Sequence, residues 1–283
     1  MKKNFLENSP SSDCLDCSSH LNLSKKIVLQ LCLSLLILFA VINSAIASDR
    51  LYEVTIYNLT HGSQFEGEDC REGQILGLFV YATHNSRVKL FELGETVSPE
   101  LALESESGFP YALADSLAAN PNVGAIVTIP NIENIPEQLL DGVICAGGKL
   151  TTTISARRGH KFLSLAGMIA PTNDGFVALN RVRLPKGRRT AVYFSPAYDS
   201  GSELNDEKCE NIPGLPGIRG CLPGDLNTDP NFPFPDPNPE GGPGAGEGYV
   251  HLHSGIHGIG DLEPSVWDWN NPVAKITIRR VRR

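Results

Sequence analysis

The chain has 283 residues, with 32 acidic and 24 basic side chains and a formal net charge of −8 at pH 7. This balance argues against nucleic acid or an anionic membrane surface as the partner, because both attract basic proteins. It is compatible with the binding of cations.

Residues 1–47 are predicted to be a leader and signal peptide. Two lysines precede an apolar run over 27–41, and the small-x-small pattern Ala45-Ile46-Ala47 follows it. We expect cleavage after this pattern, which would make the protein secreted, periplasmic or attached to the cell surface, with no membrane span left. The alternative is an uncleaved anchor, because the apolar run approaches the roughly 20 residues of a spanning helix. Residues 48–283 suit one large β domain or two small ones.

Export changes how the cysteines are interpreted. Four of them follow the leader, and an even number in an oxidising compartment predicts two disulfides. Four cysteines allow three pairings. Of these we favour Cys209–Cys221, which would close a loop of about a dozen residues, together with Cys70–Cys145.

Period-two alternation and short apolar runs predict a chain made mainly of strands. The expected strands are Leu51–Leu59, Ile75–Ala82, Val123–Ile129, Leu150–Ala156, Lys161–Ala170, Phe176–Leu184, Thr190–Phe194, Tyr249–His253 and Ala274–Val281, with Val88–Leu93 as a further strand or a bridge. In the first of them Tyr52, Val54 and Ile56 share one side, and in the last Ile276 and Ile278 point inward. The pattern predicts an all-β, antiparallel β-sandwich of about eight strands.

Two short helices interrupt the strands. Ser98-Pro99-Glu100 is a helix start, and we expect that helix to run to about Ser105. A second is predicted over Tyr111–Ala119, ended by Asn120-Pro121. Both are too short to form a layer, so they belong to a connection. Residues 211–246 hold nine of the chain's 20 prolines and are predicted to be a Pro/Gly-rich insertion over the surface.

Two acidic turns flank the predicted strands Phe176–Leu184 and Thr190–Phe194. If these strands form a hairpin about Pro185-Lys186-Gly187, Asp174 and Asp199 lie equally far from the turn and face each other. Glu203 follows Asp199 by four residues, so a compact loop would aim both carboxylates the same way. Three hard oxygen donors at one end of a sheet predict a Ca²⁺ site. The alternative is that these acidic loops are solvated turns.

Several motifs in the same order resemble bacterial members of the spondin N-terminal domain family. They are Tyr52-Glu53-Val54-Thr55-Ile56-Tyr57-Asn58-Leu59-Thr60, Ala82-Thr83-His84, Leu90-Phe91-Glu92-Leu93-Gly94, Ala170-Pro171-Thr172-Asn173-Asp174-Gly175-Phe176-Val177, Ala197-Tyr198-Asp199-Ser200-Gly201 and Asn271-Pro272-Val273-Ala274-Lys275-Ile276-Thr277-Ile278. The resemblance runs from about Leu51 to Val281. It implies an eight-stranded sandwich similar to C2 modules that binds Ca²⁺ and serves in extracellular adhesion.

The resemblance also implies which residues hold the ion. The family's ligands match Asp174, Asp199 and Glu203, the last being Glu here where animal members carry Asp. Asp206 or Glu207 is the alternative ligand at that end. The thrombospondin-type repeats of the animal proteins are missing, so matrix or integrin binding does not transfer. The expectation is a non-enzymatic, calcium-binding adhesion or interaction domain with an extracellular protein or glycan as its ligand.

The main rival site is built from histidines. His251 and His253 share one face of a predicted strand and His257 could curl back, which would give a zinc or iron site for a metal-dependent hydrolase or oxygenase. The alternative is that these histidines pack against loop backbone while Trp267 and Trp269 cover the core. The sequence contains no G-x-S-x-G, H-E-x-x-H or Walker A motif.

Arginine pairs form the last feature of the sequence. Arg157-Arg158 and Arg188-Arg189 are predicted in exposed turns, and four arginines close the chain from Arg279 onward. Either group could dock an acidic glycan, and simple solvation of the charges is the alternative.

Overall fold

The computed structural model describes residue 30 and residues 49–61, 73–129, 142–209, 211–212 and 246–281. The chain divides into two units between Ser48 and Asp49, and the fold below is that of the second. The predicted leader, apart from Gln30, and most of the predicted insertion over 211–246 lie outside the described residues. No helix in the described part has the length and apolar character needed to cross a membrane.

The predicted β-sandwich is confirmed, because the described strands form two antiparallel sheets. The four-stranded sheet has the order β5 (Lys149–Ala156), β1 (Arg50–Asn58), β11 (Ala274–Val281), β8 (Thr190–Ser195). The seven-stranded sheet has the order β10 (His251–Leu252), β9 (Ala197–Asp199), β7 (Gly175–Arg183), β6 (Phe162–Ala170), β2 (Ile75–His84), β3 (Val123–Ile129), with β4 (Val143–Ile144) also paired to β2. Eight of the described strands have six or more residues, and β4, β9 and β10 are shorter.

The main core lies between the two sheets. Val54 and Ile56 of β1 and Ile276 and Ile278 of β11 are fully buried there, as the alternation predicts. Every residue of β2 is buried, because one face of this strand meets the four-stranded sheet and the other lies under helices. A strand covered on both faces is expected to be apolar throughout.

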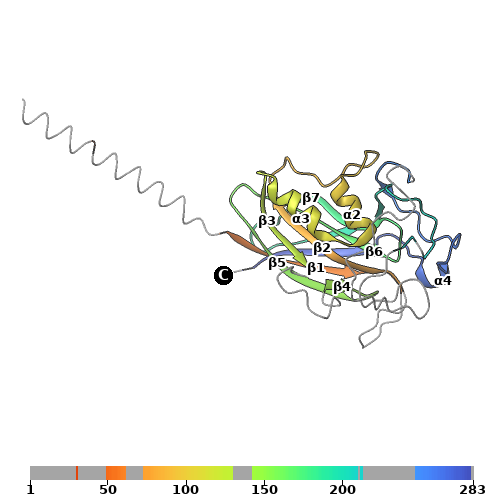
Figure 1. The fold of residues 1–283 in the computed structure, drawn as a ribbon. Coiled ribbons are helices and arrows are strands. Elements are labelled where there is room, and N and C mark those ends of the chain that lie inside the picture. The colour runs from red at the N-terminus through yellow and green to blue at the C-terminus, as the bar shows by residue number, and fades with distance from the viewer. Residues whose placement is uncertain are drawn as a thin grey trace, which may run out of the picture. The chain divides into compact units, whose positions relative to one another are not determined.

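The helices cover the outer face of the seven-stranded sheet (Figure 1). In α2 (Pro99–Ser107) the Ser98 hydroxyl accepts from the Leu101 amide at 3.3 Å, and Gly108 ends the helix in the left-handed region with φ 68°. The second helix, α3 (Pro110–Ala119), ends at Asn120 as predicted. A four-residue helix, α4 (Pro264–Trp267), lies near the C-terminal end.

The predicted hairpin between residues 176–184 and 190–194 is wrong. β7 pairs with β6 and β9, whereas β8 belongs to the other sheet and pairs with β11. The connection around Pro185 therefore crosses from one sheet to the other, and the chain returns through Pro196 to place β9 on the edge of β7. The edge that β8 would need is occupied by β9.

Cys145 and Cys209 are each disulfide-bonded. Cys70 and Cys221 lie outside the described residues. The pairing of the four cysteines stays a prediction.

Candidate metal site

The acidic site forms where β7 begins and β9 ends. Gly175 pairs with Asp199, and the Ser200 amide donates to the carbonyl oxygen of Asp174 at 3.3 Å. On its other side, Asp199 is in register with His251 of β10. Directly opposed residues of antiparallel strands have Cβ atoms about 5 Å apart. Asp174 directly precedes Gly175, and its charge acts on Asp199. The predicted meeting of the two aspartates therefore occurs, although by a sheet crossing and not by a hairpin.

Asp174 is the most enclosed member of the site. Its side chain is fully buried, and Oδ2 accepts hydrogen bonds from the Ser202 amide at 2.8 Å, the Glu203 amide at 3.1 Å and the Ser200 hydroxyl at 2.9 Å. The other oxygen, Oδ1, is buried and has no hydrogen-bond partner among the described residues. Unpaired buried carboxylate oxygens are costly, so this one indicates a missing partner.

The loop after β9 folds tightly around the two aspartates. Asp199 Oδ1 accepts from the Gly201 amide at 2.8 Å, and Asp199 Oδ2 accepts from the Asn205 amide group at 2.6 Å. Gly201 has φ 68°, and a Cβ there would lie 2.4 Å from the carbonyl oxygen of Tyr249. Only glycine fits this backbone, because it combines a left-handed conformation with close backbone approach.

Glu203 and Glu106 add two more carboxyl groups. Glu203 is buried, and within the described part of the chain its Oε2 atom has no hydrogen-bond partner. Glu106 reaches the site from α2, where it is hydrogen-bonded to Ser202. Burial first, then the charges of Glu106 and Asp174, raise the pKa of Glu203 to about 9. Burial also raises the pKa of Glu106.

The pKa values of the two aspartates are also raised. Burial, followed by the charge of Asp174, raises the pKa of Asp199 to about 8, and Glu247 contributes to the rise. Burial also raises the pKa of Asp174, although the hydrogen bonds to its Oδ2 oppose the rise. A bound cation would reverse this pattern, because it attracts several carboxylates at once.

One group of potential ligands is already within coordinating reach. Single donor atoms of Asp199, Glu247 and His251 lie within 4.8 Å of one another. His251 Nδ1 is 3.5 Å from Asp199 Oδ1 and is a buried atom without a hydrogen bond. This group shares Asp199 with the carboxylates around Asp174, but Asp174 and Glu203 are not among its members.

The other two histidines of the rival site lie outside this group. His253 is buried against Trp269, with ring centroids 5.0 Å apart, and its Nδ1 accepts from the Gly255 amide at 3.1 Å. Burial lowers the pKa of His253 to about 4. His257 is exposed and hydrogen-bonded to the Ser254 hydroxyl at 2.9 Å. Of the three predicted histidines, the group of metal-ligand atoms contains His251 alone.

Asp206 and Glu207 have other partners. Glu207 accepts the amides of His257 at 2.6 Å and Ile259 at 3.0 Å, one on each carboxylate oxygen. Asp206 accepts from the side-chain amides of Asn173 at 3.1 Å and Asn211 at 2.6 Å. The carboxylate oxygens of these two residues already accept hydrogen bonds from loop residues beside the site. They are therefore poorly placed to serve as substitute ligands.

Sequence reasoning missed Glu106 and Glu247. Glu106 lies in a helix predicted to end at about Ser105, and Glu247 stands between two glycines at the end of the proline-rich stretch. Only the alternation of Glu and Ser at the end of α2 hinted at a polar face. No protein-family model and no curated protein sequence matches this chain.

Proposed function

We propose that this protein is an exported, non-enzymatic β-sandwich that binds Ca²⁺ at the acidic site and presents the surrounding loops to an extracellular protein or glycan. The ligands would be Asp174, Asp199 and Glu203, with Glu106 and Glu247 close enough to contribute. A set of carboxylates without a soft ligand suits Ca²⁺, which takes roughly 6 to 8 oxygens in irregular geometry.

The observation that carries the proposal is the state of Asp174. This fully buried carboxylate has four donors on one oxygen and, among the described residues, none on the other, which leaves that oxygen available to a cation. A sodium ion or a water molecule would suffice for a site of low charge. This site contains several carboxyl groups, so its negative charge is high. A divalent cation compensates more charge per site and is therefore favoured.

The proposed ion would act on the loops as well as on the charges. The segment from Ser200 to Asn205 is bound to both aspartates, and Glu247 begins the return to β10. Leu204, Tyr249 and Leu252 are large apolar residues that remain exposed in these same segments. Exposed apolar side chains on ordered loops are typical of surfaces that contact partners. The resemblance to the spondin family supports the same role.

Calcium titration of the purified protein tests the proposal. A ligand that binds only the folded state stabilises it by about 2.7 kcal/mol at one hundred times its Kd. For a domain of this size that corresponds to a rise in Tm of about 5 to 10 °C. A chelated protein whose Tm does not change when Ca²⁺ is restored would exclude a structural calcium site.

A transition-metal enzyme is the second candidate, and it is favoured by the grouping of Asp199, Glu247 and His251. One imidazole and two carboxylates are a suitable donor set for zinc or iron. Elemental analysis of the purified protein distinguishes the two functions. Stoichiometric zinc or iron that is lost in His251→Ala supports the enzyme, and calcium retained in His251→Ala supports the binding domain.

A further inference from the structure

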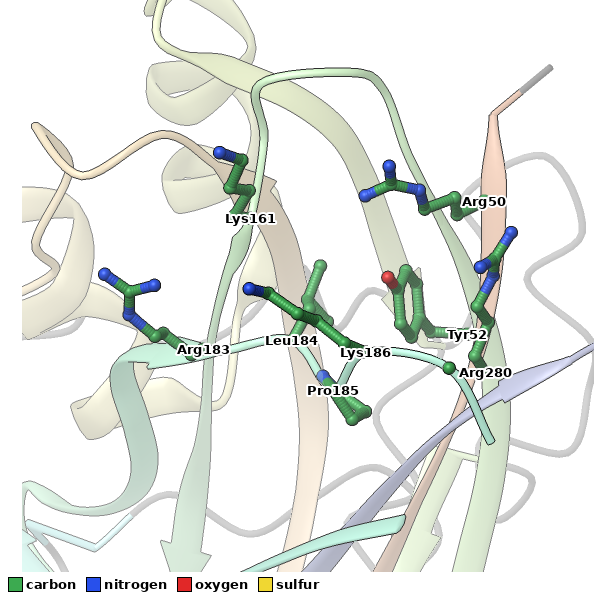
Figure 2. Close-up of a pocket in the computed structure, with 9 residues that line it drawn as sticks. Arg50, Tyr52, Lys161, Arg183, Leu184, Pro185, Lys186 and Arg280 are labelled. Carbon is green, nitrogen blue, oxygen red and sulfur yellow. The ribbon is translucent and has the colours of Figure 1, made fainter. Parts of the chain in front are cut away.

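A second charged site lies at the other end of β7. A cavity of about 430 Å³ lies there, and its lining includes five cationic side chains. Figure 2 shows these side chains. They are Arg50, Lys161, Arg183, Lys186 and Arg280. The β7 strand separates this cavity from Asp174 by nine residues, or roughly 30 Å at about 3.3 Å per residue. The two sites are therefore independent at physiological salt, where charges are screened over about 8 Å.

The cations come from segments that are distant in sequence but paired in the fold. Tyr52 of β1 is directly opposite Arg280 of β11, and Arg50 is two residues before Tyr52 on the same face of β1. The connection after β7 supplies Lys186, and Lys161 lies just before β6. In Figure 2 the ring of Tyr52 lies between the side chains of Lys186 and Arg280.

The wall of the cavity is held in place by its own contacts. The Leu184 amide donates to the carbonyl oxygen of Lys161 at 2.9 Å. The guanidinium of Arg183 lies 5.3 Å from the centre of the Phe162 ring, where the π face attracts the cation. The backbone of the wall and the Arg183 side chain are thus positioned before any ligand arrives, which lowers the entropic cost of binding one.

The positive charge of the cavity is not neutralised within the described part of the chain. None of the five cationic side chains has an acidic partner at ion-pair distance among the described residues. The neighbouring Arg279 shows the contrast, because it points to the opposite face of β11 and forms an ion pair with Glu53. The cavity therefore offers cations whose counter-charge has to come from a ligand.

The size of the cavity limits what that ligand can be. At about 30 Å³ per water molecule, 430 Å³ equals roughly fourteen waters. A single sulfate or phosphate ion, with five heavy atoms, would leave most of this space unfilled and could not reach all five cations. Leu184 and Pro185 add an apolar part to the lining, and the Tyr52 side chain adds an aromatic ring.

We propose that this basic cavity, formed by Arg50, Lys161, Arg183, Lys186 and Arg280 around Tyr52, binds a compact polyanion. The ligand carries at least two sulfate, phosphate or carboxylate groups on one small scaffold, as a sulfated sugar or a polyphosphorylated polyol does. Guanidinium groups pair with such oxyanions through two parallel hydrogen bonds, and lysines add point charges.

Isothermal titration with four probes at low salt tests this site. Sucrose octasulfate and inositol hexakisphosphate supply the two polyanion sources, while sucrose and inorganic sulfate supply the scaffold and the oxyanion alone. We expect saturable binding of at least one polyanion, no binding of sucrose, and inorganic sulfate at least about one hundred times weaker. Binding of sucrose octasulfate should be the same with Ca²⁺ present and after its removal by chelation and dialysis.

Two double variants with the same change of charge distinguish specific binding in the cavity from non-specific attraction to the basic surface. Lys186→Glu with Arg280→Glu should weaken the polyanion about tenfold or more. Arg188→Glu with Arg189→Glu changes two exposed residues on the same connection that do not line the cavity, and it should change binding less than about threefold. The neutral pair Lys186→Gln with Arg280→Gln removes the charges without adding repulsion and should give an intermediate loss.

Three results would overturn the proposal. The first is no saturable binding of either polyanion to the unchanged protein. The second is an equal loss in both glutamate double variants, which would mean non-specific attraction. The third is inorganic sulfate binding as tightly as the polyanions, which would mean an adventitious ion only.

Discussion

Replacing Asp174 by Asn separates the charge of this residue from its shape. An asparagine oxygen in the place of Oδ2 can keep the hydrogen bonds from the Ser202 and Glu203 amides. Its NH₂ group then takes the place of Oδ1, which has no partner. The variant therefore preserves the loop, removes one negative charge, and supplies a donor that points toward the remaining carboxyl groups.

The effect on stability should change sign with calcium. Neighbouring like charges repel by up to roughly 4 kcal/mol at an effective dielectric constant of 20, and partial protonation reduces this. In chelator, the free energy of unfolding of Asp174→Asn should therefore be higher than that of the unchanged protein, by about 1 to 3 kcal/mol. In Ca²⁺ it should lose most of the 2.7 kcal/mol or so that a near-saturating ion contributes.

Urea unfolding in chelator and in Ca²⁺ measures both effects, with Asp115→Asn on the exposed side of α3 as the control. The control removes the same charge. It should change neither the free energy of unfolding in chelator nor the stabilisation by Ca²⁺. The reasoning fails if Asp174→Asn is less stable than the unchanged protein in chelator and gains as much stability from Ca²⁺. That outcome would mean that Asp174 serves the loop by its hydrogen bonds alone.

Three further outcomes follow from the same structure. The pKa values of Asp199, about 8, and Glu203, about 9, are raised in the folded protein, so the stability that these groups contribute below about pH 4 is lost as the pH rises through 8 and 9. Urea unfolding of the chelated protein should therefore show stability falling between about pH 4 and 9, and a flat profile would contradict the shifts. Gly201→Ala should cost several kcal/mol, because a Cβ would meet backbone at 2.4 Å, whereas Gly187→Ala has a similar φ of 68° with open space around it and should cost about 1 kcal/mol by thermal unfolding. Asn58→Ala should cost roughly 2 to 4 kcal/mol, because the buried amide donates to two carbonyl groups at 2.7 and 2.8 Å, and equal unfolding midpoints would refute this role.

Asn58 also shows how burial changes the meaning of a sequence motif. Asn58-Leu59-Thr60 is formally an N-glycosylation sequon. In the fold, however, the Asn58 oxygen accepts both the amide and the hydroxyl of Thr60, at 3.0 and 2.7 Å. A glycan on the buried amide nitrogen would break the contacts that join β1 to the chain before β2. The motif is therefore structural in this protein.

The strands were predictable because their signal is local. Alternation places Tyr52, Val54 and Ile56 on the core side of β1, and each is nearly or fully buried. The signal fails for the shortest elements. β4 and β10 have two residues each and β9 has three, so none is long enough to show a period, and their pairing depends on neighbours supplied by the rest of the fold.

The candidate site was predictable in part, for a related reason. Asp174 directly precedes β7 and Asp199 is the last residue of the adjacent strand β9. Acidic residues at strand ends can be recognised in a sequence. Glu106 and Glu247 reach the same place from a helix and from a distant loop. No spacing rule connects them with the aspartates, because their distance is set by how α2 and β10 dock on β7 and β9.

By itself, the sequence determined which of the longer segments are extended, which residues of β1 and β11 face the core, and that two acidic turns stand at strand ends. The further strand or bridge expected over Val88–Leu93 is wrong, because no strand lies in the described segment between His84 and Pro99. Tertiary structure alone decided that β8 leaves for the other sheet, that β9 takes the free edge of β7, and that five cations from separate segments surround Tyr52. The physical reason is the range of the forces involved. Side-chain alternation acts over two residues of chain, whereas sheet edges, buried charges and cavities depend on groups that only folding brings within a few ångströms.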